Sequence, residues 1–155
     1  MPCEPDASTH SVLPGATFKD CFRIRVDGYL LTAAEAAERS LSNPPLWVST
    51  LMSTRDRLVG IFGLRGLDKT VSDPARQIGM FPVVTQSVER VVLGFDDKHL
   101  DFRIVIDVAQ GDNATDVRAT TLVLPHHWGG KAYLAAVMPF HKRIVPVMLE
   151  AIARN

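Results

Sequence analysis

Four segments with strand character follow one another between Met80 and Leu124, and they constrain the fold more than any other feature. They read MFPVVTQS, ERVVLGFD, HLDFRIVIDVA and TDVRATTLVL, and they are rich in β-branched and aromatic residues. Short polar joints, notably DDK and QGDNA, separate them, as hairpins require. These segments therefore predict an antiparallel sheet.

One more strand is expected near the start of the fold. The segment FKDCFRIRV alternates in character, which is typical of a half-buried strand. Its apolar row contains Phe18, Phe22, Ile24 and Val26, and Asp20 is the polar interruption in that row. With the four later segments, this makes about five strands.

Two short helices are expected after this first strand. Thr32 and Glu35 form a capping box in front of AAEAAERSL, so a helix begins there. The prolines of SNPP end that helix and open a second one from Leu46 to Phe62. Residues 63–79 carry three glycines and a proline without a period, and we interpret them as a long excursion.

A long final helix is predicted from about Gly130 to Arg154. At about 100° per residue, one apolar side is expected to contain Tyr133, Val137, Phe140, Ile144 and Met148. Pro139 and Pro146 lie away from that side and should bend the helix around the sheet.

This order of elements predicts an α+β fold. We expect a curled antiparallel sheet with two short helices after the first strand and a long, proline-kinked C-terminal helix across its concave face. Residues 1–15 lack periodicity and are predicted to be a loose arm, followed by a single domain over residues 16–155.

Composition excludes several classes of partner. Seventeen basic and seventeen acidic residues cancel, so no net field draws the chain to nucleic acid or to an anionic membrane. Apolar runs such as AYLAAVMPF are far shorter than the roughly 20 residues of a membrane span. The N-terminus lacks a basic segment followed by an apolar one, so we expect a cytoplasmic protein. Cys3 and Cys21 have no CxxC spacing and are predicted to be free thiols.

Several segments resemble one bacterial family. LPGATFKDCFRI, IGMFPV, DDKHLDFRI and GGKAYLAAVMPFHKRIV occur in the order seen in the domain of unknown function DUF2867, so the resemblance runs from about Leu13 to Ala153. The element order also resembles the helix-grip fold of the START and Bet v 1-like superfamily. That second resemblance implies an apolar cavity between sheet and terminal helix. Members of the first family are sometimes fused to nucleotide-dependent reductases, which implies small-molecule metabolism and a reductase as a partner.

His99, Asp101, Arg103 and Asp107 form a charged row on the segment HLDFRIVIDVA. Residues two apart on a strand point to the same face, so Asp101 is placed to orient His99 as a general base. Arg103 is placed to hold a substrate carboxylate or to pair with Asp101. The alternative is a solvated outer face. Because the alternating apolar set is expected to face the terminal helix, this row should lie on the opposite side of the sheet.

His141 falls within the apolar arc of the final helix. A buried imidazole needs hydrogen-bond partners, since each unmet group costs about 1 to 3 kcal/mol. It is either a core histidine satisfied by a nearby polar group or the polar anchor of a cavity. Trp128 and Tyr133 are candidates for the mouth of that cavity.

Metal and cofactor sites are not expected. His126 and His127 are adjacent on an extended segment and face opposite ways, and no third ligand is suitably spaced. GIFGLRG follows a helix and lacks the phosphate-binding glycine pattern.

Three hypotheses for function follow. The first is binding of a small apolar or amphipathic molecule between the sheet and the final helix, with His141 as polar anchor and Arg103, Trp128, Tyr133, Val137, Phe140, Ile144 and Met148 as further contacts. The second is a cyclase, isomerase or hydrolase that uses His141, or His99 with Asp101. The third is an interaction module that pairs with a second copy or with a reductase.

Overall fold

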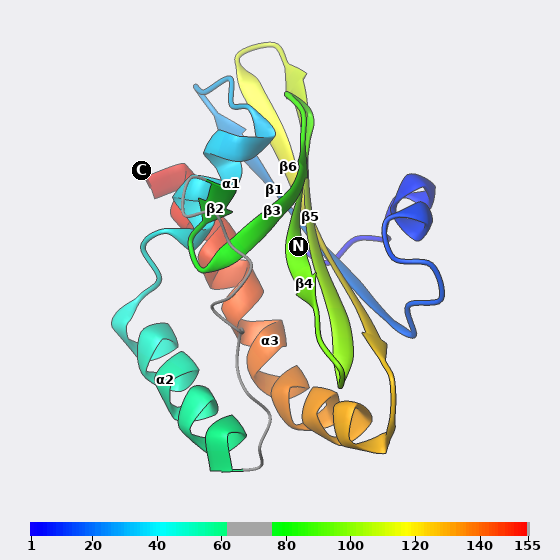
Figure 1. Ribbon diagram of the computed structural model, residues 1–155. Helices are drawn as coiled ribbons and strands as arrows, with labels where there is room; N and C mark the ends of the chain where they lie inside the picture. Colours follow the sequence, from blue (N-terminus) through cyan, green and yellow to red (C-terminus); the bar gives the residue numbers. More distant parts are fainter. Residues whose placement is uncertain (62–75, 155) are drawn as a thin grey trace.

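A computed structural model describes residues 1–61 and 76–154 of the chain. Helices α1 (Ala33–Leu41), α2 (Leu46–Ile61) and α3 (Trp128–Arg154) lie on one side of an antiparallel sheet, and the short 3-10 helix η1 (Ala7–Ser11) lies on the other (Figure 1). The strands are β1 (Phe18–Asp27), β2 (Gln77–Ile78), β3 (Phe81–Gln86), β4 (Arg90–Asp96), β5 (Leu100–Gly111) and β6 (Ala114–Pro125). The predicted α+β class, with a long helix after the last strand, is confirmed.

The sheet has the order β1-β6-β5-β4-β3-β2. The later strands pair with their neighbours along the chain, whereas β1 pairs with β6, from Phe18 opposite Val123 to Asp27 opposite Ala114. Because α3 follows β6 directly, this order brings the first half of α3 back over the start of β1. The five predicted strands are β1 and β3 to β6, and β2 adds a two-residue strand at the far edge.

Local turn chemistry closes the hairpins. Gly111 pairs with Ala114, which leaves the two-residue loop Asp112–Asn113 between β5 and β6. Asn113 has a φ of 58°, a conformation that asparagine tolerates better than most residues. In β4, Gly94 has a φ of 150°, and a Cβ there would overlap the carbonyl oxygen of Phe102 on β5. Only glycine allows this close approach of the two strands.

The inner face of the sheet, which α1 and α3 cover, holds the larger core. It includes Phe22, Ile106 and Leu149, with Ile104 packed against it. Alanines of α1 bring that helix close to the sheet, and Ala33, Ala36 and Ala37 are fully buried. Ile104 and Ile106 of β5 thus point to the side of the sheet that α1 and α3 cover, which is the side that the alternation predicted.

The outer face of the sheet carries a second core, built with the N-terminal segment. Leu13 and Ala16 pack against Val92, Val105 and Leu122. We expected residues 1–15 to be a loose arm, but they include η1, whose Thr9 is fully buried, and the buried Leu13. The reason is that the outer face is also apolar at its centre, because β4, β5 and β6 carry apolar residues at successive positions there.

The middle of the chain was predicted to hold a second helix and a long excursion. The helix that begins at Leu46 is present as α2, while Phe62 and most of the excursion 63–79 lie outside the described residues.

No helix in the described part of the chain has both the length and the apolar character needed to cross a membrane.

Candidate functional site

An acidic and an imidazole side chain meet on the inner face of the sheet. Nε2 of His141 on α3 lies 3.1 Å from Oδ1 of Asp20 on β1 and 3.0 Å from Oδ2. Both side chains are largely covered, with 15% of His141 and 18% of Asp20 exposed. Asp20, the polar residue in the apolar row of the first strand, therefore forms a hydrogen bond with His141, the polar residue in the apolar arc of the last helix.

The sheet order explains this contact. Asp20 belongs to the inner row of β1 between Phe18 and Phe22, and α3 crosses that row after leaving β6. The ring of Phe18 stands edge-on to His141, with 6.0 Å between the ring centroids. Phe18 thus supports the imidazole from the side on which β1 begins.

The pair fixes which nitrogen of His141 is available. A carboxylate accepts only, so Nε2 carries a hydrogen and donates it to Asp20. Within residues 1–61 and 76–154, no hydrogen bond is formed by Nδ1 of His141, and the buried Oδ2 of Asp20 accepts no well-directed one. A neutral His141 therefore offers Nδ1 as an acceptor, which is the arrangement of an oriented base or of a polar anchor.

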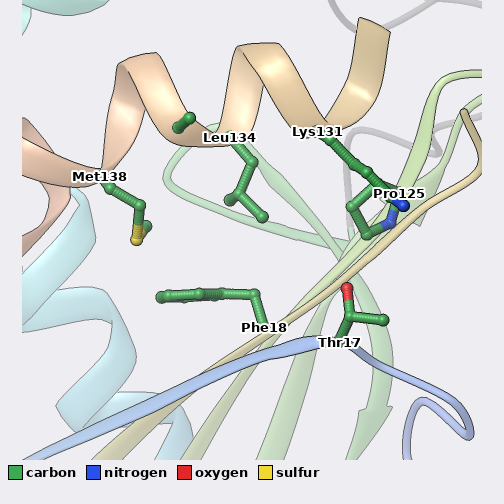
Figure 2. Close-up of a pocket in the computed structure, with 7 residues that line it drawn as sticks. Thr17, Phe18, Pro125, Lys131, Leu134 and Met138 are labelled. Carbon is green, nitrogen blue, oxygen red and sulfur yellow. The ribbon is translucent and has the colours of Figure 1, made fainter. Parts of the chain in front are cut away.

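A pocket of about 340 Å³ lies next to this pair. Figure 2 shows Leu134 and Met138 of α3 pointing toward Phe18, with Thr17, Pro125 and Lys131 at one end. Ala135 completes the lining. The walls are mostly apolar, and the polar groups are the hydroxyl of Thr17 and the ammonium of Lys131. Phe18 is the wall that the pocket shares with the Asp20–His141 pair.

The pocket uses a neighbouring stripe of α3 and not the predicted one. Its helix residues are Lys131, Leu134, Ala135 and Met138, and His141 and Val145 continue that stripe toward the inner core. The residues of α3 that were predicted to contact a ligand do not line this pocket. Tyr133, Val137 and Ile144 are half-buried, Met148 is buried, and Phe140 and Trp128 are 49% and 81% exposed.

The shift has a simple cause. α3 is apolar over most of its circumference, so the helical wheel identifies a broad arc without deciding which stripe faces the sheet. Asp20 and Phe18 were available as signals, because a polar residue in an apolar strand row needs a partner from the covering layer. That complementarity, and not hydrophobicity, marks the stripe that contains His141.

Three other histidines, His99, His126 and His127, gather where β5 begins and β6 ends. Nδ1 of His99 lies 2.7 Å from Nε2 of His127, and Nε2 of His126 lies 2.9 Å from Oδ1 of Asp101. The predicted His99–Asp101 pair is therefore wrong, since each residue takes a different histidine as its partner. Across the sheet, Asp101 lies opposite Leu124 of the outer core, on the face away from His141.

Arg103 also differs from the prediction. Its guanidinium lies 2.7 Å from the carboxylate of Asp96 and donates to the carbonyl oxygens of Phe95 and Phe102. It therefore does not pair with Asp101, and its donors are used within the hairpin instead of being directed at a substrate carboxylate. Because it lies opposite Gly94, whose φ is 150°, it satisfies one carbonyl group on each strand beside this glycine. Its role is to hold the β4–β5 hairpin together.

His127 caps the start of α3. The backbone N–H of Gly129 donates to Nδ1 of His127, so a neutral His127 carries its hydrogen on Nε2 and donates it to His99. Nε2 of His99 is then the last donor in this series of hydrogen bonds, and it is buried with no partner among the described residues. Among the described residues, no three His, Cys, Asp or Glu side chains are arranged to hold a metal ion.

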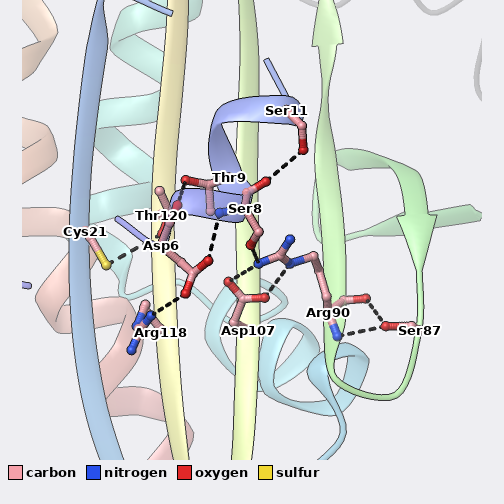
Figure 3. A network of polar contacts seen from close by, with 10 residues as sticks. All are labelled: Asp6, Ser8, Thr9, Ser11, Cys21, Ser87, Arg90, Asp107, Arg118 and Thr120. Atoms are coloured by element: carbon pink, nitrogen blue, oxygen red, sulfur yellow. Dashed lines mark hydrogen bonds and ion pairs between the residues drawn. The ribbon is translucent and has the colours of Figure 1, made fainter. Parts of the chain in front are cut away.

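A polar network ties the N-terminal segment to the outer face of the sheet. Figure 3 shows Arg90 of β4 bonded to both Asp107 of β5 and Ser8 of η1. The hydrogen bonds with Asp107 raise the pKa of Arg90 above its usual value. Asp6 pairs with Arg118, and hydrogen bonds from Ser8 lower the pKa of Asp6. The acidic side chain at position 107 is thus paired within the chain.

The cysteines correct another prediction. We expected free thiols, but Cys3 and Cys21 form a disulfide, with their Cα atoms 5.1 Å apart. The N–H of Cys3 donates to the carbonyl oxygen of Cys21, so the N-terminal segment runs beside β1 and places the two residues side by side. Spacing along the sequence does not reveal this, because the segment folds back through η1.

Comparison with known proteins gives one match. The model of a family described as "Protein of unknown function (DUF2867)" matches residues 12–148. No curated protein and no solved structure matches the chain. The matched region contains β1, the pocket residues and His141, so the candidate site lies within it.

Proposed function

This chain belongs to the DUF2867 family of proteins of unknown function, and we propose that it binds a small amphipathic molecule in the pocket between β1, β6 and α3. The observation that supports this proposal is a mostly apolar pocket whose lining includes one ammonium group, that of Lys131. A volume of about 340 Å³ suits a small organic ligand. The resemblance to the helix-grip fold implies a cavity between the sheet and the terminal helix, which is where this pocket lies, but the resemblance itself remains a prediction.

The lining residues indicate the ligand's chemistry. Phe18, Leu134 and Met138 offer apolar surface to a flat or branched body, and Lys131 offers a positive charge to an anionic group. A ligand that displaces the ring of Phe18 reaches Nδ1 of His141, which then serves as the inner polar anchor. The proposed ligand therefore has an apolar body, an anionic group at one end and a hydrogen-bond donor at the other.

A dye of matching chemistry tests this proposal. Anilinonaphthalene sulfonate combines an aromatic body with an anion, and its fluorescence should rise saturably on binding. Ala135→Phe fills the pocket and should abolish the signal, while Ala136→Phe, the neighbouring exposed alanine outside the lining, should leave it unchanged. Equal binding by both variants would place the dye elsewhere and refute the pocket.

The charge at the rim has its own control. Lys131→Gln should weaken dye binding about five-fold, the effect of losing a half-exposed ion pair of roughly 1 kcal/mol. Lys142→Gln removes an exposed lysine of the same helix that does not line the pocket, and it should have no effect. Native mass spectrometry of the purified protein then tests for a co-purified ligand of this class.

A second candidate function is hydrolysis of a ligand bound in the same pocket. The Asp20–His141 pair favours it, because an imidazole held by a carboxylate through Nε2 leaves Nδ1 to take a proton from water. Water then adds to an ester carbonyl, the alcohol leaves with a proton, and an acid and an alcohol result. With p-nitrophenyl acetate as the probe, His141→Asn should abolish turnover, while the dye is still bound through the lining residues Phe18, Leu134 and Lys131. Unchanged turnover in this variant would refute hydrolysis and leave ligand binding as the proposed function.

The interaction hypothesis is less well supported. It depends on the charged row of β5, and Asp101, Arg103 and Asp107 are all paired within the chain. We therefore propose ligand binding in preference to pairing with a second copy or with a reductase. The same proposal includes a cytoplasmic location, where a disulfide is typically reversible.

A further inference from the structure

The free edge of β1 is covered by the first three residues of the chain. β1 is an edge strand, with β6 on one side. On the other side, the N–H of Arg23 donates to the carbonyl oxygen of Met1 at 2.8 Å, and the N–H of Cys3 donates to that of Cys21 at 2.9 Å. The terminal ammonium donates to the carbonyl oxygen of Arg23 at 2.8 Å. Residues 1–3 thus pair with β1 through an isolated antiparallel bridge between Pro2 and Phe22.

These hydrogen bonds alone do not hold the segment. The net gain from one hydrogen bond is similar in size to the entropy lost when one residue is ordered, so three bonds and three residues roughly cancel. Met1 is 79% exposed, and Pro2 has no N–H to add. The covalent bond between Cys3 and Cys21 therefore decides whether residues 1–3 stay on the β1 edge.

The rest of the N-terminal segment is held independently. Leu13 and Ala16 are buried in the outer core, Thr9 is fully buried, and Asp6 and Ser8 are bonded to Arg118 and Arg90. Opening the disulfide removes none of these contacts. The segment therefore divides into a fixed part from about Asp6 onward and a part before it that depends on the disulfide.

We propose that the Cys3–Cys21 disulfide is a reversible redox clasp that opens and closes the β1 edge. A dithiol reductant attacks the disulfide, gives two electrons and two protons, and leaves as its own disulfide, so that Cys3 and Cys21 become thiols. Residues 1–5 then leave β1, and the N–H of Arg23 and the carbonyl oxygen of Cys21 lose their partners. An open strand edge of this kind can pair with another extended chain.

The clasp lies close to the candidate site. Cys21 follows Asp20 in β1, with its side chain on the outer face while that of Asp20 faces α3. The same strand contributes Phe18 to the pocket wall. Opening the clasp should therefore loosen the strand that carries the wall and the acidic partner of His141. This consequence depends on the proposed function, whereas the release of residues 1–5 does not.

Hydrogen exchange measured by mass spectrometry tests the clasp. In the oxidised full-length protein, the Arg23 amide should be protected, and after reduction with dithiothreitol it should exchange about ten-fold faster or more. Amides of β4, β5 and β6 should keep their protection. Equal protection of Arg23 in both states would overturn the proposal, and so would loss of protection throughout the sheet, since that result means global unfolding.

Two further measurements complete the test. Iodoacetamide should label no cysteine in the oxidised protein and two in the reduced one. Cys3→Ser should show fast exchange at Arg23 with or without dithiothreitol, which separates the disulfide from other effects of the reductant. Protection of Arg23 in this variant would refute the clasp.

Dye affinity keeps the two proposals distinguishable. Weaker binding of anilinonaphthalene sulfonate after reduction supports coupling between the clasp and the pocket, and unchanged binding refutes that coupling alone. If the oxidised protein binds no dye in the pocket, the proposed function fails, while the exchange result at Arg23 still decides the clasp.

Discussion

At the scale of single residues, the Asp20–His141 pair satisfies two polar groups that would otherwise be costly under α3. Its geometry agrees with both a ligand anchor and a base, because Nδ1 is the ring nitrogen that has no hydrogen bond to the described residues. What the pair contributes to stability is a separate question from what it contributes to function, and each can be measured.

Removing the carboxylate should destabilise the fold. Asp20→Ala leaves the Nε2 hydrogen of a largely buried His141 without an acceptor, so the free energy of unfolding should fall by about 1 to 3 kcal/mol. Urea unfolding of the variant measures this. The double variant Asp20→Ala with His141→Ala should lose less than the sum of the single losses. Strict additivity would contradict an interaction between the two side chains.

Gly94 provides a residue-scale test of the β4–β5 geometry. Gly94→Ala places a Cβ against the Phe102 carbonyl at a φ of 150°, so unfolding should become easier by about 2 kcal/mol or more. Gly111→Ala is the matched control, because its Cβ would meet no atom closer than 3.9 Å and its φ is ordinary. Similar losses in the two variants would argue against the close strand approach at Gly94.

At the scale of elements, the capping box of α1 behaves as the sequence indicates. The N–H and hydroxyl of Thr32 each lie 2.8 Å from Oε2 of Glu35, and the N–H of Glu35 donates to the hydroxyl of Thr32. The hydrogen bonds from the backbone and then from the side chain of Thr32 lower the pKa of Glu35 below 4.5. The box therefore makes the stability of α1 depend on pH.

The direction of that dependence follows from the lowered pKa. The stabilisation by ionised Glu35 is complete above its unfolded value of about 4.5 and is lost as the pH falls through the folded value. The difference in unfolding free energy between wild type and Glu35→Gln should thus be constant near neutral pH and shrink toward pH 3. Parallel curves over this range would contradict the box. Thr32→Ala should cost about 1 kcal/mol at neutral pH.

α3 illustrates how far an element can be predicted. Its length and its two prolines, Pro139 and Pro146, agree with the prediction from the sequence, and it begins two residues earlier than expected because His127 accepts from Gly129. The stripe that faces the sheet was not predictable from hydrophobicity, since the competing stripe with Val137 and Ile144 is equally apolar. The position of β1 decides between them.

At the scale of the whole molecule, the sheet is covered on both faces. α1 and α3 cover the inner face, and η1 with the following residues covers part of the outer face. The charged side chains of β5, Asp101, Arg103 and Asp107, each have a partner within the chain.

The outer core can be tested through its N-terminal component. Leu13→Ala should reduce the free energy of unfolding by about 2 to 5 kcal/mol, the cost of a cavity in a packed core. Leu30→Ala, at a leucine that is 59% exposed, should have little effect. Thermal or urea unfolding distinguishes them. A negligible loss at Leu13 would restore the picture of a loose arm.

The sequence by itself determined the strands β1 and β3 to β6, the three α-helices, the capping box and the family, because alternation, helical period and hydrogen bonds between near neighbours are local. It also indicated that a buried His141 needs a polar partner, and it marked Asp20 as the polar interruption of an apolar strand row. That they are partners of one another, across 121 positions, was decided by the pairing of β1 with β6, which sets what lies under α3. The same tertiary arrangement brought Cys3 beside Cys21 and gave His99 and Asp101 separate histidines. Such contacts depend on which distant segments the sheet order places together, and no local pattern carries that information.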